Sequence, residues 1–390
     1  LLLDNCEHLV ADVAELTEAL LTSCPRLRVL ATSREPLGVP GEVLHPVDAL
    51  AEPDAVRLFV DRAAAVRPGF TLDAATRPVV TEICRRLDGQ PLPIELAAAR
   101  LRTLSPREIA ARLADRFRLL TTGARTALPR HQTLRAVVDW SWDLLTEPER
   151  AVGRRLGAFA GGATLAAAER VCGPDAWDAL TSLVDKSLVV AVPQPDGPTR
   201  YRMLETIRAY AGEKLDAAGE RPAAEAAHAA FVLDLVEEAE PHIRRREQLH
   251  WLARLRAEAD EIDLALRRTT TSDGPVAYRI VVATMWSWLI RGRLEEGKRS
   301  LAALPPPSAE LDPHIRALAL AYQAMAAIGS GDIASGRVRA DTAIAALATL
   351  PRPWHPVLEL VEPITVAFAE QDEGPLRRLA ATADDPWTRA

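Results

Sequence analysis

Two short stretches near the start of the chain combine residue types that could bind a phosphate and a metal ion. The apolar run Leu1–Leu3 ends in Asp4 and Asn5, and a second run, Leu27–Ala31, ends in Thr32-Ser33-Arg34. An acidic side chain at the carboxyl end of a buried parallel strand lies where open α/β sheets bind ligands, and it can hold Mg²⁺ through water. If the two strands are neighbours, Arg34 lies near Asp4, and its guanidinium matches the oxygens of a terminal phosphate. Taken alone, each stretch is more typical of a strand that ends in an ordinary polar turn.

A third stretch, Gly89-Gln90-Pro91-Leu92-Pro93, comes directly before the alanine-rich segment Ile94–Arg100. A rigid proline turn can press the helix that follows it against a purine ring. An ordinary helix start with Pro93 at its first position explains the pattern equally well, because proline is favoured there. Gly89 and Pro91 are therefore candidate nucleotide contacts that the stretch alone does not distinguish from a helix start.

One further stretch resembles a phosphate-binding loop, and we reject it. Gly292–Arg299 nearly matches G-x-x-x-x-G-K-[ST], but it lacks the Ser or Thr that holds Mg²⁺, and its two adjacent glutamates would repel a phosphate. It also follows a helical segment instead of a strand, and its glycine pattern recurs at 331–336. We interpret it as a turn of a helical repeat. Lys186 and Lys214 do not lie in glycine-rich loops either, so the sequence contains no Walker A motif.

The first 122 residues must position these side chains. Apolar runs at 1–3 and 27–31, joined by an amphipathic helix at 9–21, predict a parallel βαβ unit, and residues 42–47 predict a third strand. From residue 53 the pattern becomes helical, with helices expected at 54–66, 74–87, 93–101 and 105–120. Ser105 and Glu108 predict a capping box at the start of the last of these helices. Residues 121–130 are typical of a linker.

Residues 131–220 predict a separate winged helix-turn-helix unit. The expected elements are helices at 134–145, 147–159, 165–171 and 176–186, strands at 188–192 and 199–203, and a last helix at 204–217. Helices followed by a hairpin are the order of a winged helix. The helix that would enter a DNA groove, 176–186, carries Asp178 and Asp185 but only one basic residue, Lys186. Because groove binding needs arginine and lysine, this helix is better suited to packing against protein.

From residue 221 onward the chain is rich in alanine and leucine and predicts helices with short breaks. The segments Gly292–Gly297 and Gly331–Gly336 share the pattern G-x-[LI]-x-x-G, followed by an apolar helical face. This pattern marks a turn into the second helix of a pair. We therefore expect stacked helix pairs of the TPR or HEAT kind.

The composition limits the class of protein. Of the 390 residues, 48% are hydrophobic and 26% are charged, and the net charge is −7. These values are typical of a globular protein with two or three domains, and they exclude a disordered chain. The net charge argues against a protein that binds nucleic acid over its whole surface but allows a local basic patch. The four cysteines have neither metal-ligand nor disulfide-scaffold spacing.

The same sequence predicts a soluble, cytoplasmic protein. The longest nearly uncharged apolar stretch, Ile280–Ile290, is far shorter than the ~20 residues of a membrane span, and no signal-peptide pattern is present. The chain opens at Leu1, within an expected strand and without a methionine, which indicates a piece of a longer protein.

Five stretches follow one another in an order that carries a family resemblance. They are Leu-Leu-Leu-Asp-Asn-Cys-Glu-His at 1–8, Ala-Thr-Ser-Arg-Glu-Pro-Leu at 31–37, Leu-Asp-Gly-Gln-Pro-Leu-Pro-Ile-Glu-Leu-Ala-Ala-Ala-Arg at 87–100, Trp-Ser-Trp-Asp-Leu-Leu at 140–145 and Tyr-Arg-Met-Leu-Glu-Thr-Ile-Arg at 201–208. The set resembles the STAND signal-transduction ATPases, in the bacterial branch of AfsR-type and LuxR-type transcriptional regulators. The resemblance covers residues 1–220 specifically and residues 221–390 only as a style of helical repeat.

The resemblance implies a mainly α fold with an α/β start. Residues 1–122 would be the C-terminal part of an NB-ARC-like P-loop NTPase domain with its helical subdomain. Residues 123–220 would be a winged-helix domain, and residues 221–390 a TPR-like α-solenoid that is incomplete. In that family ADP holds the protein closed, whereas ATP and an inducer open it for assembly.

The resemblance also implies roles for single residues. Asp4 would be the Walker B ligand of Mg²⁺, Arg34 the sensor arginine for the γ-phosphate, and Pro91 the proline of the GxP motif beside adenine. The neighbouring motif residues complete the implied nucleotide-binding set, and they are Asn5, Thr32 and Gly89.

Two departures from the family pattern accompany these roles. The Met-His-Asp signature of related switches falls on Met203-Leu204-Glu205, where Leu204 replaces the histidine that would contact the β-phosphate of ADP. The Walker A loop is expected upstream of Leu1, so the resemblance implies ATP hydrolysis only for a complete protein.

We therefore expect an ATP/ADP-dependent signalling switch of a bacterial transcriptional regulator, with ATP or ADP and Mg²⁺ as cofactors. The helical repeats would bind protein partners or a small inducer and could support self-association, DNA would be bound only through a domain outside this chain, and no membrane is involved. Two alternatives stay open. One is a non-catalytic helical-repeat scaffold with a degenerate ATPase remnant, and the other is a winged helix that binds DNA directly.

Overall fold

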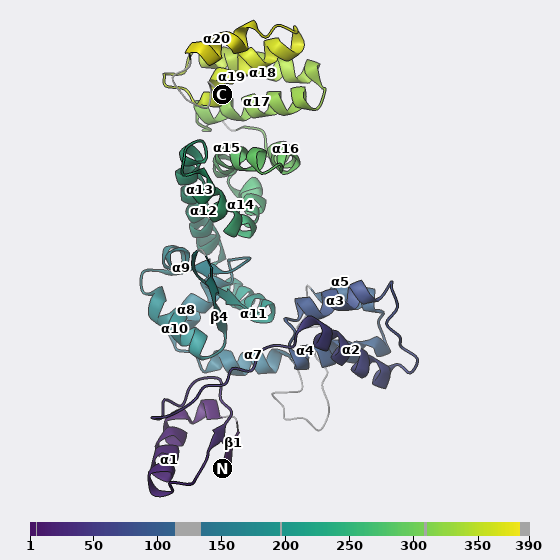
Figure 1. Ribbon diagram of the computed structural model, residues 1–390, viewed down its shortest axis with the longest axis vertical. Helices are drawn as coiled ribbons and strands as arrows, with labels where there is room; N and C mark the ends of the chain where they lie inside the picture. The colour runs from purple at the N-terminus through teal and green to yellow at the C-terminus, as the bar shows by residue number, and fades with distance from the viewer. Residues whose placement is uncertain (5, 114–133, 196, 308–309, 383–390) are drawn as a thin grey trace. The chain divides into compact units, whose positions relative to one another are not determined.

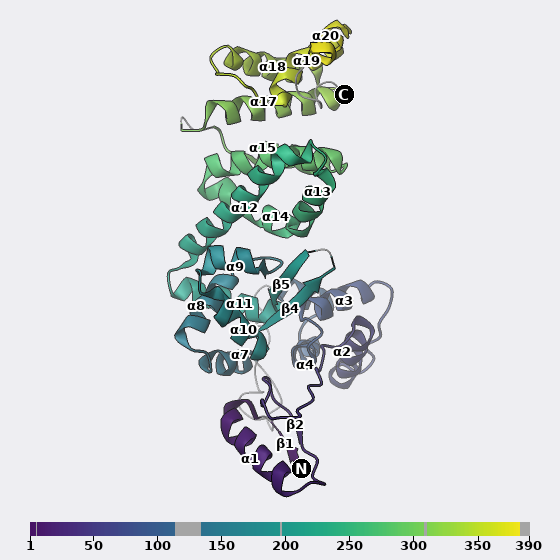
Figure 2. The same ribbon diagram turned by 60° about the vertical axis from the view of Figure 1, so that its left-hand side comes forward.

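The computed structural model describes residues 1–4, 6–113, 134–195, 197–307 and 310–382. They form two compact units. The first comprises Leu1–Ala158 and Gly162–Arg221, and the second comprises Phe159–Gly161 and Pro222–Ala390. Figures 1 and 2 show the elements within each unit. The predicted fold class is confirmed in its main features, because the chain is mainly helical, starts with an α/β segment and contains a winged helix.

The first unit opens with the predicted parallel βαβ segment. Strand β1 (Leu2–Leu3) and strand β2 (Leu30–Ala31) run parallel, with Leu2 opposite Leu30 and Leu3 opposite Ala31. The short helix η1 (Cys6–His8) and helix α1 (Val10–Ser23) connect them. The two strands end side by side (Figure 2), which brings the residues that follow them to one edge.

The predicted third strand at 42–47 is wrong, because these residues have no regular structure. The Glu42 carboxylate instead accepts hydrogen bonds from the backbone N–H groups of Leu37 (3.0 Å) and Gly38 (2.8 Å). These bonds fold the segment into a local turn, and Val47 beyond it is 95% exposed. The apolar residues that suggested a strand are therefore not buried, and the local side-chain bonds replace strand pairing.

A helical subdomain follows in the first unit. It consists of α2 (Glu52–Val66), α3 (Arg77–Arg86), α4 (Pro91–Ala99), η2 (Arg100–Arg102) and α5 (Pro106–Arg112). Phe59, Ile83 and Ile94 form part of its buried core. The predicted capping box is confirmed, since Glu108 accepts from the Ser105 N–H (2.8 Å) and donates its own N–H to the Ser105 hydroxyl (3.3 Å). Residues 114–133, with the end of the predicted helix and the predicted linker, lie outside the described residues.

The winged helix has the predicted order of elements. It consists of α7 (Leu134–Asp143), α8 (Glu147–Leu156), β3 (Ala163–Thr164), α9 (Leu165–Cys172), α10 (Ala176–Asp185), β4 (Val189–Gln194), β5 (Gly197–Met203) and α11 (Glu205–Ala217). The strands form an antiparallel sheet in the order β3-β5-β4. The sequence did not predict β3, because a strand of two residues carries no periodic signal. Trp142 of α7 and Tyr210 of α11 pack edge to face, with ring centroids 5.4 Å apart.

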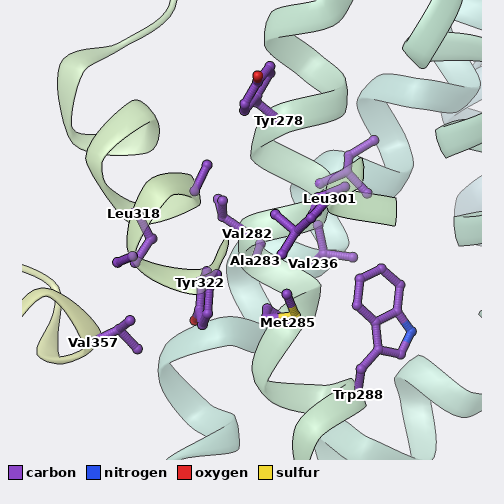
Figure 3. Packing of buried hydrophobic residues seen from close by; sticks show 14 of the residues in the cluster. Val236, Tyr278, Val282, Ala283, Met285, Trp288, Leu301, Leu318, Tyr322 and Val357 are labelled. Carbon is purple, nitrogen blue, oxygen red and sulfur yellow. The ribbon is translucent and has the colours of Figure 1, made fainter. Parts of the chain in front are cut away.

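The second unit is an array of helices that pack on their neighbours. Its elements are α12 (Arg221–Ile243), α13 (Gln248–Ala257), α14 (Ala259–Ser272), α15 (Gly274–Ile290), α16 (Leu294–Ala303), α17 (Pro313–Gly329), α18 (Ile333–Leu347), α19 (Pro356–Ala369) and α20 (Gly374–Thr382). Figure 3 shows part of the core between these helices, in which Tyr322 and Leu318 of α17 lie near Val282 and Met285 of α15.

The repeated glycine pattern has a physical explanation in this array. Gly292 and Gly331 adopt φ angles of +69° and +89°, the left-handed turn that joins the helices of a pair. The second glycine of each pattern lies where two helices touch. A Cβ on Gly297 would be 2.6 Å from the Met285 sulfur, and a Cβ on Gly336 would be 2.5 Å from Ile328 Cγ1. The first glycine therefore makes the turn and the second allows close packing, which confirms the turn of a helical repeat in place of a phosphate loop.

Among the helices of the described residues, none combines the length and the apolar character needed to cross a bilayer.

Candidate functional site

Two of the predicted site residues meet at the ends of β1 and β2. The Thr32 hydroxyl donates a hydrogen bond to Asp4 Oδ1, and both residues are exposed. The backbone holds this pair in place, because Thr32 N–H donates to the carbonyl of Leu3 (2.9 Å) and Cys6 N–H donates to the carbonyl of Thr32 (3.0 Å). A carboxylate and a hydroxyl are oxygen ligands of the kind that Mg²⁺ prefers. Asn5, the next predicted residue, lies outside the described residues.

This pair is not a complete metal site by itself. The part of the chain that the structure describes contains no group of three His, Cys, Asp or Glu residues that could hold a metal ion. Mg²⁺ is commonly held by one or two carboxylates together with water and the phosphates of a bound nucleotide. Asp4 and Thr32 therefore fit the protein side of such a shared site and do not fit an all-protein metal cage.

Arg34 connects this strand edge to the winged helix. Its guanidinium Nη1 donates to the Ser141 hydroxyl on α7, and its backbone carbonyl accepts from the Ser187 hydroxyl at the end of α10 (3.0 Å). Burial lowers the pKa of Arg34, while the neighbouring Glu7 carboxylate acts in the opposite direction. Arginine nevertheless keeps its charge at any physiological pH. The structure thus places a half-buried cation two residues after Thr32 and against the winged helix.

Gly89 and Pro91 form the turn between α3 and α4. Gly89 is buried with φ +64°, and a Cβ there would be 2.4 Å from the carbonyl oxygen of Leu50. Leu50 N–H donates in turn to the carbonyl of Gly89 (3.1 Å), so only glycine fits this close approach. Helix α4 begins at Pro91, not at Pro93 as predicted, because both prolines fit in the first turn. Pro91 is exposed at that start.

Asp88, which precedes Gly89, makes a contact that the sequence did not predict. Its carboxylate Oδ2 accepts a hydrogen bond from the backbone N–H of Glu205, the first residue of α11 (2.8 Å). This contact brings the turn that contains Gly89 to the segment Met203-Leu204-Glu205. The Asp-Gly pair after a helix is a recognisable turn signal, but nothing local identifies a partner that lies 117 residues away.

The helix expected to enter a DNA groove has an acidic outer surface. Trp177, Asp178 and Asp185 of α10 are exposed. Lys186, the basic residue at its end, donates to both carboxylate oxygens of the buried Glu149 on α8, at 2.8 Å each. Because this lysine is held within the winged helix, the electrostatics of α10 disfavour contact with phosphates.

Comparisons with known proteins support the assignment of a winged helix in this chain. The family of winged helix-turn-helix domains matches residues 145–216. A Mycobacterium tuberculosis protein named "Putative HTH-type transcriptional regulator" is 55% identical over 227 residues, which are 56% of this chain and 26% of that protein. An uncharacterized protein of the same species is 49% identical over 231 residues, 57% of this chain and 58% of the other.

A weaker likeness exists among solved structures. A Signal Transduction ATPase with Numerous Domains (STAND) protein with a tetratricopeptide repeat sensor, from Pyrococcus horikoshii, is similar with a TM-score of 0.39 and 13% identity, over 98% of this chain and 55% of that one. Across these comparisons, the chain spans 26% of the mycobacterial regulator and 58% of the second mycobacterial relative.

Proposed function

We propose that this chain is part of a nucleotide-dependent switch in a transcriptional regulator. The observation that carries the proposal is the position of Arg34. It follows the Asp4–Thr32 pair at the edge of a parallel sheet, where nucleotides bind in α/β proteins, and it is also hydrogen-bonded to Ser141 of the winged helix. The guanidinium of Arg34 can therefore donate its hydrogen bonds either to a phosphate or to the winged helix. The similarity to a mycobacterial protein named as a transcriptional regulator supports the wider role.

The residues suit a switch between two nucleotide states. Asp4 and Thr32 would hold Mg²⁺, which neutralises phosphate charge when it is bound. Arg34 would leave Ser141 for a γ-phosphate, because the phosphate carries the opposite charge and can accept two parallel hydrogen bonds from the guanidinium, whereas Ser141 offers one uncharged acceptor. With ADP no γ-phosphate competes, and Arg34 would stay on Ser141. Gly89 and Pro91 would form the turn beside the base, and Asn5 would be a further nucleotide-binding residue.

Other parts of the protein would carry the remaining functions. A phosphate-binding loop would come from polypeptide outside these residues, and we expect ATP hydrolysis only in a protein that contains it. The helical array would bind a protein partner or a small inducer. Because α10 is acidic and Lys186 is paired with Glu149, we propose that DNA is bound by a domain outside this chain.

The test measures ATP-analogue and ADP affinities in the protein expressed from its complete reading frame. Arg34→Ala should weaken binding of a non-hydrolysable ATP analogue by roughly tenfold or more, the value of a hydrogen bond to a charged group, and should change ADP affinity much less. Ser141→Ala should act in the opposite direction and favour the ATP analogue, because it removes the competing partner of Arg34. Arg26→Ala, at an exposed arginine of the same α/β segment, is the matched control and should change neither affinity.

Other outcomes would decide between the alternatives. Unchanged affinities in both Arg34→Ala and Ser141→Ala would contradict the switch. Absence of any nucleotide binding by the complete protein would favour a helical-repeat scaffold with an ATPase remnant. Tight, salt-dependent binding of a DNA duplex that Trp177→Ala abolishes would favour a winged helix that acts on DNA directly.

A further inference from the structure

Helix α11 begins without a capping side chain of its own. The residue at its N-cap position is Leu204, which has no polar group, and no side-chain cap bond from that position is present. The first N–H groups of a helix need an acceptor, and they carry the positive end of the helix dipole. The Asp88 carboxylate supplies the acceptor for Glu205, at 2.8 Å. A charged residue from the helical subdomain therefore caps a helix of the winged helix.

The local backbone aims Asp88 at this position. Asp88 has φ +55°, a left-handed conformation that aspartate tolerates better than most residues with a Cβ. Hydrogen bonds at the end of α3 fix the turn, from Asp88 N–H to the carbonyl of Arg85 (3.0 Å) and from Gly89 N–H to the carbonyl of Cys84 (3.1 Å). Because the turn is held by α3 and by Leu50, the carboxylate is preorganised before it meets α11.

The capped helix is firmly attached to the rest of the winged helix. Ile207, Tyr210 and Leu215 of α11 are buried in its core, and Tyr210 packs edge to face against Trp142 of α7. The Tyr210 hydroxyl also donates to Asp139 of α7. A restraint on the first turn of α11 is consequently a restraint on α7, the helix that carries Ser141.

We propose that Asp88 is a latch that holds the winged helix to the helical subdomain by capping α11. As a latch for the closed state of the switch, it rests on the proposed function. The capping bond itself does not depend on a nucleotide. In this chain the Asp88 carboxylate accepts the hydrogen bond at the start of α11, where Leu204 has no polar side chain. The closed state is therefore held by a contact between two parts of the same chain. Opening requires Asp88 and Glu205 to separate.

The test of the latch is amide hydrogen exchange on the 390-residue chain, with Asp88→Gly as the main variant. Glycine adopts φ +55° more easily than aspartate, so this change removes the carboxylate without straining the turn. Exchange at the first turn of α11 should become on the order of fivefold faster, the factor that corresponds to the loss of a typical cap of about 1 kcal/mol. Asp88→Asn, which keeps an oxygen acceptor but not the charge, should give a smaller effect.

Asp73→Gly is the matched control. Asp73 also accepts backbone hydrogen bonds, from Ala75 (3.0 Å) and Thr76 (2.8 Å), but it does so locally before α3. This variant should speed exchange near the start of α3 and leave α11 unchanged. Unchanged exchange at the start of α11 in Asp88→Gly would overturn the latch, and so would an equal effect of Asp73→Gly at α11.

The same variant separates the latch from the proposed function. In the complete protein with ADP bound, Asp88→Gly should raise exchange in α7 to the level seen with the ATP analogue. If the complete protein binds no nucleotide, the proposed function fails and with it the role of Asp88 in a switch. Hydrogen exchange in the 390-residue chain still tests the capping contact in that case. Failure of the proposed function and failure of the latch are therefore distinguishable.

Discussion

Replacing Glu149 with glutamine should remove most of the electrostatic interaction that ties α8 to α10 in the winged helix. The buried Glu149 carboxylate accepts from both the Lys186 ammonium (2.8 Å) and the Thr146 N–H (2.7 Å), and it also accepts from the Ser182 hydroxyl. Burial acts to raise the pKa of this carboxyl. The hydrogen bonds from Lys186, Ser182 and Thr146 outweigh that effect and lower the pKa from 4.5 to about 2.

This pKa sets the expected magnitude. A carboxyl whose pKa is lower in the folded than in the unfolded chain stabilises the fold above the unfolded value of 4.5, and the stabilisation is lost as the pH falls toward 2. At about 1.4 kcal/mol for each pKa unit, the contribution at pH 7 is about 3 kcal/mol, and roughly 2 kcal/mol of it should be lost at pH 3. Glu149→Gln should therefore destabilise the winged helix by up to about 3 kcal/mol at pH 7 and much less at pH 3.

Hydrogen exchange of the core amides of α8 and α10 measures the opening free energy of this region in the full chain. The control is Glu147→Gln on the same helix. Glu147 pairs with Arg154 (3.0 Å), but its side chain is 68% exposed, so its loss should cost about 1 kcal/mol or less. A Glu149→Gln effect that is equal at pH 7 and pH 3, or no larger than that of Glu147→Gln, would refute the reasoning.

Two further predictions concern packing and thiol reactivity. Gly336→Ala should destabilise the array by about 1–3 kcal/mol in thermal unfolding, because its Cβ would lie 2.5 Å from Ile328. Gly329→Ala, where a Cβ meets nothing within 4 Å, should be neutral or stabilising, and equal effects at the two glycines would contradict the packing role of Gly336. Alkylation at pH 8 followed by mass spectrometry should label the exposed Cys24 first, since burial raises the pKa of Cys172 to about 12. Rapid labelling of Cys172 in the folded protein would contradict that burial.

The sequence predicted those helices and strands whose residue pattern lies within the element itself. Two apolar runs with a helix between them gave the adjacent parallel strands that bring Asp4 and Thr32 together. The order of helices and a hairpin gave the winged helix. The prediction of a third strand at 42–47 failed, because the apolar residues of this segment do not show that Glu42 will accept hydrogen bonds from the preceding turn.

Contacts between segments that are distant in the sequence could not be predicted from local patterns. Nothing near Asp88 indicates that its partner is Glu205, and nothing near Arg34 indicates Ser141, because both pairs are created by tertiary packing. The glycine pattern at 331–336 predicted a turn. That Gly336 is also needed for close helix packing became evident only when the neighbouring helix, with Ile328, was in place.

The most direct test of the switch follows α7 in the complete protein. Amide exchange around Ser141 is compared with ADP and with a non-hydrolysable ATP analogue, both in the presence of Mg²⁺. If Arg34 leaves Ser141 for a γ-phosphate, exchange in α7 should be faster with the ATP analogue than with ADP, and Arg34→Ala should abolish the difference. Identical exchange in the two nucleotide states, with both nucleotides bound, would contradict the account.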